Sequence, residues 1–328
     1  MAGKKHLKVA VWRYDRTQAL HDGRIGIDGY ATLVIEEPLE DMFAKAFGTA
    51  EYEVSELSFS NYLRLRVDGD CSYQGIPVFP SRSFRHGAFY VRGEGDVREP
   101  AHLVGRRIGV REFSMTAALA ARGALRDQFG IESDQVSWVV GDVDSRERDQ
   151  ISLPRLFRKL SIEVARDGAL LDKMLLAGEI DAILAYKPPK SALGDSPKSR
   201  RLFEQAEAIE KAYFTKTGIF PIMHLMGVRS DRIDADPQLP MSAYRAFAAA
   251  QEVANADLTY EQALRIGLPW LRFELERTIA TMGPGFWPSG FAANRKVMEA
   301  MIAWSFKDGL ISRLVEPEQL FHPSVLAT

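Results

Sequence analysis

Short apolar runs alternate with helical patterns along the first two thirds of the chain. The runs at residues 7–12 (LKVAVW) and 31–37 (ATLVIEE) are rich in β-branched residues and predict strands. After Pro38, apolar residues recur at the spacing of an amphipathic helix, namely at Leu39, Met42, Phe43, Ala46 and Phe47. This alternation favours βαβ units with mainly parallel strands, and hence an α/β fold.

The pattern begins again near residue 105, which indicates a second domain. Arg107–Val110 predicts a strand, and an Ala-rich helix follows it. From about Met241 to Leu314 the chain is almost wholly helical. A helical tail must pack on another layer, and the first part of the chain, with few helices of its own, is the natural surface for it.

The chain therefore predicts a discontinuous first lobe, residues 1–104 plus 222–328, and a second lobe, residues 105–221. A length of 328 residues suits two cores of this size. Because the chain would cross twice between the lobes, we expect a hinge and a ligand cleft between them.

The composition is that of an ordinary globular protein, with 46% hydrophobic and 26% charged residues and a formal net charge of -2. This near-neutral balance gives no reason to expect nucleic acid or a membrane surface as a partner. No apolar run is long enough to predict a membrane-spanning helix. The single cysteine, Cys71, excludes an internal disulfide, and the first residues lack a signal-peptide pattern, so we expect a cytoplasmic protein.

Common catalytic motifs are missing from the sequence. It contains no glycine-rich phosphate loop, no H-E-x-x-H and no G-x-S-x-G, which argues against nucleotide, phosphoryl-transfer and common hydrolase mechanisms. No sequence feature supports a metal site, although a metal shared between His86 and His224 stays open. The sequence leaves the oligomeric state undecided, and a homo-oligomer is one alternative.

Ligands of open α/β sheets bind beyond the carboxyl ends of the strands, so the residues that follow each strand are candidates. After the first strand stand Arg13, Tyr14, Asp15 and Arg16, which place two guanidinium groups beside a carboxylate. A surface ion-pair turn is the alternative. Ser60 stands at a predicted strand-to-helix junction, where helix capping would also explain it.

A third candidate region is the extended segment around residue 84. Arg82, Phe84 and His86 would share one face of an extended chain, with Arg85 on the other. One such face offers a ligand cations and an aromatic wall. Arginines on an edge strand also protect against aggregation, which is the alternative here.

Further candidates lie in the second lobe and at the return crossing. Ser114, Met115 and Thr116 precede or begin the Ala-rich helix, where free backbone N–H groups and the helix dipole suit a carboxylate. Capping by Ser114 would explain the same pattern. The others are Tyr186 and Lys187, which follow the strand DAILA, and His224, which could equally be a buried core histidine.

Six segments carry a family resemblance, in order along the chain: DRTQAL, IPVFPSRSFRHGAFYV, AGEIDAIL, TGIFPIMH, FWPSGFAANRK and EPEQLF. Together they resemble the 4,5-dihydroxyphthalate decarboxylase family from Tyr14 to Phe321. The resemblance implies a two-lobed fold of the type II periplasmic-binding-protein class. It also implies a cytosolic carboxy-lyase that converts 4,5-dihydroxyphthalate to protocatechuate without an organic cofactor. Lys187 departs from the arginine that the family pattern places before two prolines.

The first functional hypothesis is therefore a decarboxylase of a hydroxylated aromatic dicarboxylate. The alternative is a cytosolic binding protein or sensor with the same ligand site, and a different cytosolic enzyme on this fold ranks below both. Loss of carbon dioxide from an arene needs a general acid, for which histidine is suited near neutral pH. We expect His86 to be this acid, with His224 or Asp15 acting on a ring hydroxyl.

Overall fold

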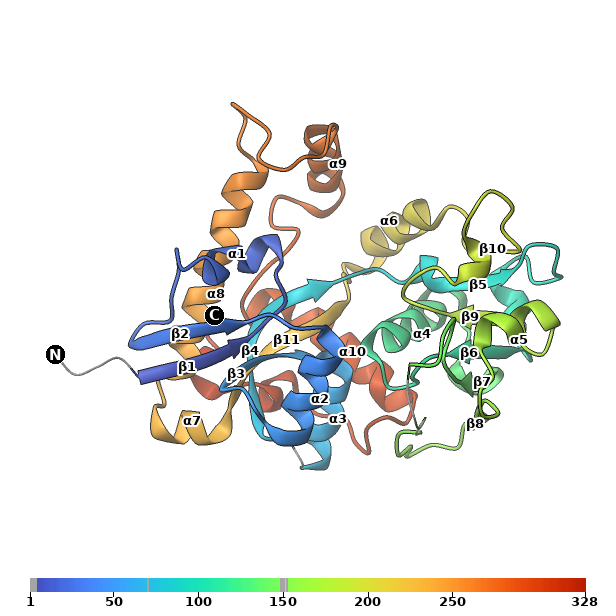
Figure 1. The fold of residues 1–328 in the computed structure, drawn as a ribbon, viewed down its shortest axis with the longest axis horizontal. Coiled ribbons are helices and arrows are strands. Elements are labelled where there is room, and N and C mark those ends of the chain that lie inside the picture. The colour runs from blue at the N-terminus through green and yellow to red at the C-terminus, as the bar shows by residue number, and fades with distance from the viewer. Residues whose placement is uncertain (1–4, 70, 148–150, 152) are drawn as a thin grey trace. The chain divides into compact units, whose positions relative to one another are not determined.

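The computed structural model describes residues 5–69, 71–147, 151 and 153–328, and the chain divides into two compact units (Figure 1). Unit 1 contains the chain up to Arg82, together with Ile222–Glu299 and Val315–Thr328. Unit 2 contains Ser83–Pro221 and Ala300–Leu314. Among the described residues, no helix is long and apolar enough to cross a membrane.

Unit 1 is built on a five-stranded mixed sheet. Its strands, in spatial order, are β2 (Tyr30–Ile35), β1 (Lys5–Ala10), β3 (Val54–Ser58), β11 (Ile222–Arg229) and β4 (Tyr73–Arg82). β1 is parallel to β2 and β3, whereas β11 is antiparallel to both β3 and β4. The carboxyl ends of β1, β3 and β4 therefore meet the amino end of β11 at one edge of the sheet.

Helices cover this sheet, as expected for strands that are buried on both faces. All five residues of β3 are buried, so neither of its faces meets solvent. The helices of unit 1 are α1 (Gln18–His21), α2 (Leu39–Thr49), α3 (Phe59–Asp68), α7 (Ser230–Ala235), α8 (Leu239–Leu258) and α9 (Leu271–Met282). α8 packs on β4 and on α1.

Unit 2 contains a six-stranded mixed sheet. The spatial order is β10 (Ser199–Arg201), β5 (Phe89–Arg92), β9 (Ala182–Leu184), β6 (Arg107–Val110), β7 (Ser137–Val140) and β8 (Ile162–Val164). The strands β9, β6, β7 and β8 are parallel to one another, whereas β5 runs antiparallel to both β9 and β10. Its helices are α4 (Thr116–Phe129), α5 (Leu171–Ala177) and α6 (Ala206–Thr217).

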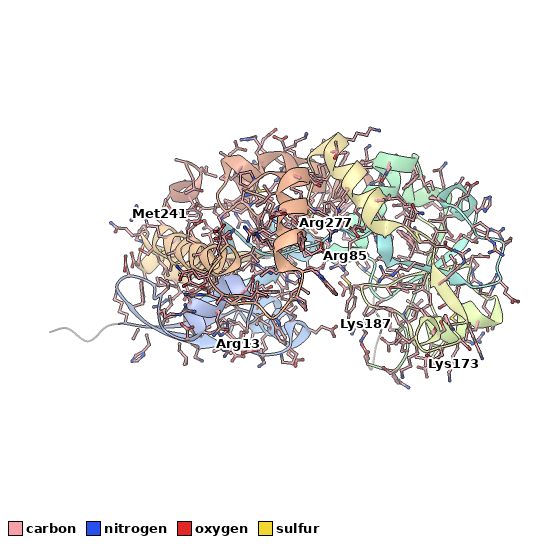
Figure 2. All side chains as sticks on the ribbon, turned by 90° about the horizontal axis from the view of Figure 1, so that it is seen from above. Arg13, Arg85, Lys173, Lys187, Met241 and Arg277 are labelled. Atoms are coloured by element: carbon pink, nitrogen blue, oxygen red, sulfur yellow. The ribbon has the colours of Figure 1, made fainter. Side chains whose placement is uncertain are left out.

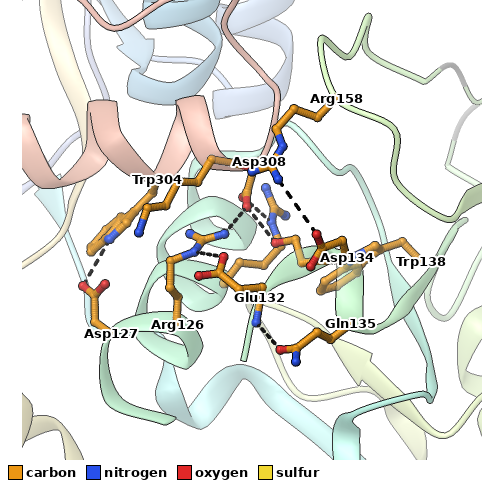
Figure 3. Close-up of polar contacts among 12 residues, drawn as sticks. Arg126, Asp127, Glu132, Asp134, Gln135, Trp138, Arg158, Trp304 and Asp308 are labelled. Carbon is orange, nitrogen blue, oxygen red and sulfur yellow. Dashed lines mark hydrogen bonds and ion pairs between the residues drawn. The ribbon is translucent and has the colours of Figure 1, made fainter. Parts of the chain in front are cut away.

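The helix α10 (Arg295–Lys307) starts in unit 1 and ends in unit 2, where a buried ionic network fixes its last residues (Figure 3). Asp308 is fully buried and accepts hydrogen bonds of 2.7 Å from Arg122 Nε, Arg126 Nη2 and Ser133 Oγ. Burial would raise the pKa of Asp308, but the two guanidinium groups hold it below its ordinary value. A buried carboxylate needs such partners, so the end of α10 is bound to α4.

The two units differ from the expected lobes in two segments. The sequence predicts residues 83–104 in the first lobe, but β5 pairs with β9 and therefore belongs to unit 2. It also predicts the whole helical tail in the first lobe, whereas Ala300–Leu314 joins unit 2 through Asp308. Both differences arise from long-range pairing, which hydrophobic periodicity does not report.

Candidate active site

A buried glutamate organises the polar cluster at the carboxyl edge of the unit 1 sheet. Glu56, in the middle of β3, is 0% exposed. Its Oε1 accepts hydrogen bonds from the Tyr14 hydroxyl at 2.7 Å and from His224 Nδ1 at 2.6 Å, and its Oε2 accepts one from the Trp12 N–H at 2.9 Å. Three donors to one buried carboxylate form a well-satisfied acceptor site.

The strand order brings His224 to this glutamate. In the sheet register His224 lies beside Ser58 of β3 and Ser81 of β4, and its pairing with β4 is irregular on both sides. Its ring meets that of Phe43 edge-on at 4.9 Å, and its side chain is 15% exposed. Because Nδ1 bonds to Glu56, Nε2 is the ring nitrogen that can exchange a proton with a ligand.

An arginine lies beside the same cluster. The Arg16 guanidinium lies over the ring of Tyr14 at 4.2 Å and over that of Trp287 at 4.1 Å, and its Nε donates to the Pro80 carbonyl at 2.6 Å. Burial lowers the pKa of Arg16, but an arginine stays cationic at neutral pH. Burial, followed by the charge of Glu56, raises the pKa of Tyr14, so its phenol stays protonated and donates.

Unit 2 has a pocket at the start of α4. Arg111, only 9% exposed, pairs with Glu147 at 2.8 Å and donates to the Tyr186 hydroxyl at 3.3 Å. The remaining lining residues are Ala88, Val110, Met115, Ala117, Ala118, Val143, Asp144, Leu184, Ala185 and Lys187. A cation next to the N-terminus of a long helix suits an anionic group, although Glu147 and Asp144 offset part of that charge.

Within the described residues, no three His, Cys, Asp or Glu side chains are grouped so that they could hold a metal ion. Both polar regions contain hydrogen-bonding and ion-pairing groups. The unit 1 cluster joins an imidazole to a buried carboxylate, which is an arrangement suited to proton transfer.

Comparison with known proteins identifies the family. No family model matches the chain. A 4,5-dihydroxyphthalate decarboxylase of Comamonas testosteroni is 35% identical over 324 residues, which cover 98% of each chain. A protein of the same name from Pseudomonas putida is 32% identical over 211 residues, covering 64% of this chain and 82% of the relative. The chain belongs to the 4,5-dihydroxyphthalate decarboxylase family.

Solved structures confirm the predicted fold class of this family member. The periplasmic aliphatic sulphonate binding protein of Escherichia coli is 11% identical, with a TM-score of 0.55 over 97% of this chain and 92% of that chain. The alkanesulfonate-binding protein of Xanthomonas axonopodis pv. citri bound to MOPS is 13% identical, with a TM-score of 0.52 over 99% of each chain. At these identities the likeness shows a type II periplasmic-binding-protein-like fold.

The candidate residues that follow the first strand lie in two different settings. Tyr14 and Arg16 belong to the Glu56 cluster. Arg13, labelled in Figure 2, is exposed and pairs with Glu36 at 2.7 Å. Asp15 is 56% exposed and pairs with Arg16 at 2.8 Å, while Ser60 is fully buried in the first turn of α3.

The expected common face of Arg82, Phe84 and His86 does not form, because β4 ends at Arg82 and a short 3-10 helix begins at His86. Arg82 is buried in unit 1 and donates to the Asn294 side chain. Phe84 stacks on Phe220 in unit 2 at 4.8 Å. Side chains alternate between the two faces only while a strand continues. The end of β4 at Arg82 therefore separates the three side chains.

His86 lies in the interior of unit 2. It is 2% exposed, its Nε2 is 2.9 Å from Gln128 Oε1, and its ring is 5.2 Å from that of Tyr213. Burial lowers the pKa of His86 and also that of the neighbouring Arg85. His86 therefore has the surroundings of a buried, hydrogen-bonded core histidine, which is the alternative that the sequence offers for His224.

The residues expected at the start of α4 and after β9 lie in two different settings. Met115, Tyr186 and Lys187 line the unit 2 pocket, and Lys187 is labelled in Figure 2. Ser114 and Thr116 are buried and are not among the lining residues. Ser114 is not the cap either, because Met115 occupies the N-cap position and the Ser114 hydroxyl donates to Glu112 at 2.7 Å.

Sequence reasoning missed Glu56 and Trp287, which complete the unit 1 cluster. Glu56 left a readable signal: it is the one charged residue in the strand VSELS, and alternation places it on the same face as Ser58. A charged residue inside a buried strand requires a partner. Trp287 left no such signal, since its partner Arg16 is far away in sequence.

Proposed function

We propose that the protein is a carboxy-lyase that converts 4,5-dihydroxyphthalate to protocatechuate and carbon dioxide. The observation that carries this proposal is the 35% identity to a 4,5-dihydroxyphthalate decarboxylase over 98% of each chain. The Glu56 cluster supports it, because it supplies a proton donor and a cation at the edge of the sheet where ligands of α/β proteins bind.

The reaction requires protonation of the carbon that loses its carboxylate. Direct loss of carbon dioxide would leave an electron pair in the ring plane, where the π system does not delocalise it. Each carboxylate of this substrate has a hydroxyl para to it, and electron density from that oxygen favours proton addition at the carboxyl-bearing carbon. The bond to the carboxylate then breaks, its electron pair restores the aromatic ring, and carbon dioxide leaves.

His224 is the proton donor that the geometry favours. In the imidazolium form both ring nitrogens carry protons, and Glu56 accepts the one on Nδ1 at 2.6 Å. That hydrogen bond fixes the ring orientation and leaves the Nε2 proton for the substrate carbon. After proton transfer the neutral imidazole keeps its Nδ1–H bond to Glu56 and recovers a proton from solvent.

Arg16 is the group that we assign to the retained carboxylate. Two aromatic rings and the Pro80 carbonyl fix the direction of its guanidinium, and its side chain is 18% exposed. A preorganised guanidinium binds a carboxylate at a low cost in side-chain entropy. A substrate carboxylate can replace Asp15, the ion-pair partner of Arg16. Because Asp15 is exposed, its carboxylate then stays in contact with solvent.

The test is incubation of the purified protein with 4,5-dihydroxyphthalate while carbon dioxide release and the ultraviolet spectrum of protocatechuate are followed. Stoichiometric appearance of both products would support the proposal. Tight calorimetric binding without turnover would contradict it and favour the binding-protein alternative. Phthalate, which lacks the para hydroxyls, is the matched substrate control and should bind without losing carbon dioxide.

A further inference from the structure

A segment of unit 1 exposes an unusual amount of apolar surface. We call residues 259–282 the arm: the loop after α8 and the helix α9, which extend away from the sheet of unit 1 (Figure 1). Of the 15 large hydrophobic residues exposed among the described part of the chain, five lie within 14 consecutive positions of the arm: Tyr260 (39%), Leu264 (59%), Leu268 (44%), Trp270 (66%) and Phe273 (59%).

The arm has little to stabilise it within one chain. Between residues 259 and 282 only Leu271 is buried. α9 has 12 residues, and an isolated helix of that length is marginal in water. Most helical stability in proteins comes from packing of an apolar face, so a further apolar surface is needed to cover Trp270 and Phe273.

The charges of the arm indicate what kind of surface this is. The arm carries three acidic residues, Glu261, Glu274 and Glu276, and three basic residues, Arg265, Arg272 and Arg277. Within one chain Arg272 pairs with Glu261 and Glu276, and Arg277 pairs with Glu274, at exposed positions where such ion pairs contribute little to stability. Nucleic acid or an anionic membrane would select an excess of basic residues, which the arm does not have. A two-fold axis reverses the direction of the arm in the second copy. The acidic residues of each arm can then face the basic residues of the other.

The exposed apolar area supplies a large part of what self-association requires. At the exposed fractions given above, Trp270 and Phe273 present roughly 200–300 Å² of side chain, against about 800 Å² per partner in a standard interface. The three other apolar residues and the stems of the arginines can supply much of the remainder. Aromatic residues and arginine are also the types enriched at interface centres.

We propose that the arm is the interface between two copies of this chain, related by a two-fold axis. Trp270 and Phe273 form its apolar centre, and Glu274, Glu276, Arg272 and Arg277 exchange their partners within the arm for partners across the interface. This inference does not depend on the proposed decarboxylase activity, because none of the arm residues belongs to the Glu56 cluster.

The first experiment measures mass by light scattering and sedimentation across the micromolar range for the full chain and two leucine variants. Leu264→Glu lies in the arm, and Leu193→Glu is a matched control, since Leu193 is 57% exposed in unit 2. The wild type and Leu193→Glu should be dimers. Leu264→Glu and Trp270→Glu should weaken the dimer by at least about 30-fold, the range for central interface residues.

The second experiment reverses the sign of charged residues in the arm and leaves its apolar residues unchanged. An acidic arm (Arg272→Glu with Arg277→Glu) and a basic arm (Glu274→Arg with Glu276→Arg) should each be monomeric, because each repels its own copy. Mixing the two should restore a one-to-one dimer. Near-UV circular dichroism and the thermal midpoint of each variant show whether unit 1 is folded.

Three outcomes would overturn the proposal: a monomeric wild type at the highest concentration, a dimer that persists in Trp270→Glu and in both charge variants, or no heterodimer on mixing folded variants. Binding of the wild type to phosphatidylglycerol vesicles without self-association would also overturn it and assign the arm to a lipid surface. Turnover of 4,5-dihydroxyphthalate reports on the decarboxylase proposal separately, so the two failures are distinguishable.

Discussion

The regions around His224 and His86 contain the same residue types in opposite environments. In unit 1, His224 Nδ1 is 2.6 Å from Glu56, and its side chain is 15% exposed. In unit 2, His86 Nδ1 is 3.8 Å from Glu210, and its side chain is 2% exposed. The first histidine has a hydrogen-bonded carboxylate and access to solvent, whereas the second has aromatic neighbours and the amide of Gln128.

This difference decides which histidine can move a proton. Burial lowers the pKa of His86 and raises that of Glu210, so both partners favour their neutral forms. Glu56 instead accepts hydrogen bonds from three donors, one of which is His224. A histidine beside such a carboxylate can carry and release a proton, whereas a neutral buried histidine mainly fills space.

The largest expected effect is on turnover. His224→Gln should lower kcat by roughly 10²–10⁴, the range for loss of a general acid, while calorimetric binding of 4,5-dihydroxyphthalate is retained. His86→Gln, the matched variant, should keep near-normal kcat because Gln can still bond to Gln128. If His86→Gln loses turnover and His224→Gln does not, the acid is His86 as the sequence suggested.

A smaller effect is expected from the two glutamates. Glu56→Gln should lower kcat by about 10–100-fold, because the partner that orients a catalytic histidine contributes on that scale. The glutamine amide would also place an N–H donor opposite groups that themselves donate to Glu56. Glu210→Gln should leave kcat unchanged, since Glu210 is 3.8 Å from His86. Equal kcat values for the two variants would remove the distinction between the regions.

The partly buried arginines of the two regions provide a test of substrate binding. Arg16→Ala should weaken binding of 4,5-dihydroxyphthalate by about tenfold or more, because a hydrogen bond to a charged group contributes on the order of 1.5–3 kcal/mol. Arg85→Ala is the control, as burial lowers the pKa of Arg85 in the same direction. If Arg16→Ala and Arg85→Ala change the calorimetric dissociation constant equally, Arg16 has no special role in substrate binding.

The comparison also shows what could be predicted from the sequence. The β-branched runs identified β1, β2 and β6 and the α/β class, because local periodicity determines these features. Tyr14 and Arg16, both expected as candidates after the first strand, lie in the Glu56 cluster. The single glutamate in VSELS also carried a signal, since a charged residue within a buried strand needs a partner.

Other features depend on contacts that no local pattern contains. The end of β4 separates Arg82 from His86, and the pairing of β5 with β9 moves residues 83–104 into unit 2. The last part of α10 joins unit 2 because Asp308 meets Arg122 and Arg126, which are far away in sequence. Pairings of this kind become visible only when the sheets are assembled.

The smallest expected effect concerns stability and pH, and it belongs to His86. Because burial lowers its folded-state pKa below the unfolded value of about 6.5, His86 is neutral in both states at higher pH and contributes no pH dependence there. Below about pH 6.5 the unfolded chain takes up a proton that the folded chain resists. Stability should therefore fall as the pH falls from 6.5 toward the folded-state pKa, with a slope of at most about 1.4 kcal/mol per pH unit.

His86→Gln removes this titrating group and keeps a polar side chain opposite Gln128. Urea unfolding of both proteins between about pH 5 and pH 8 gives the difference in unfolding free energy at each pH. That difference should be constant above pH 6.5 and should shift in favour of the variant at lower pH. A difference that does not change with pH would mean that His86 has the same pKa in the folded and unfolded chains. Burial would then not distinguish the two histidines, and the assignment of the acid would rest on turnover alone.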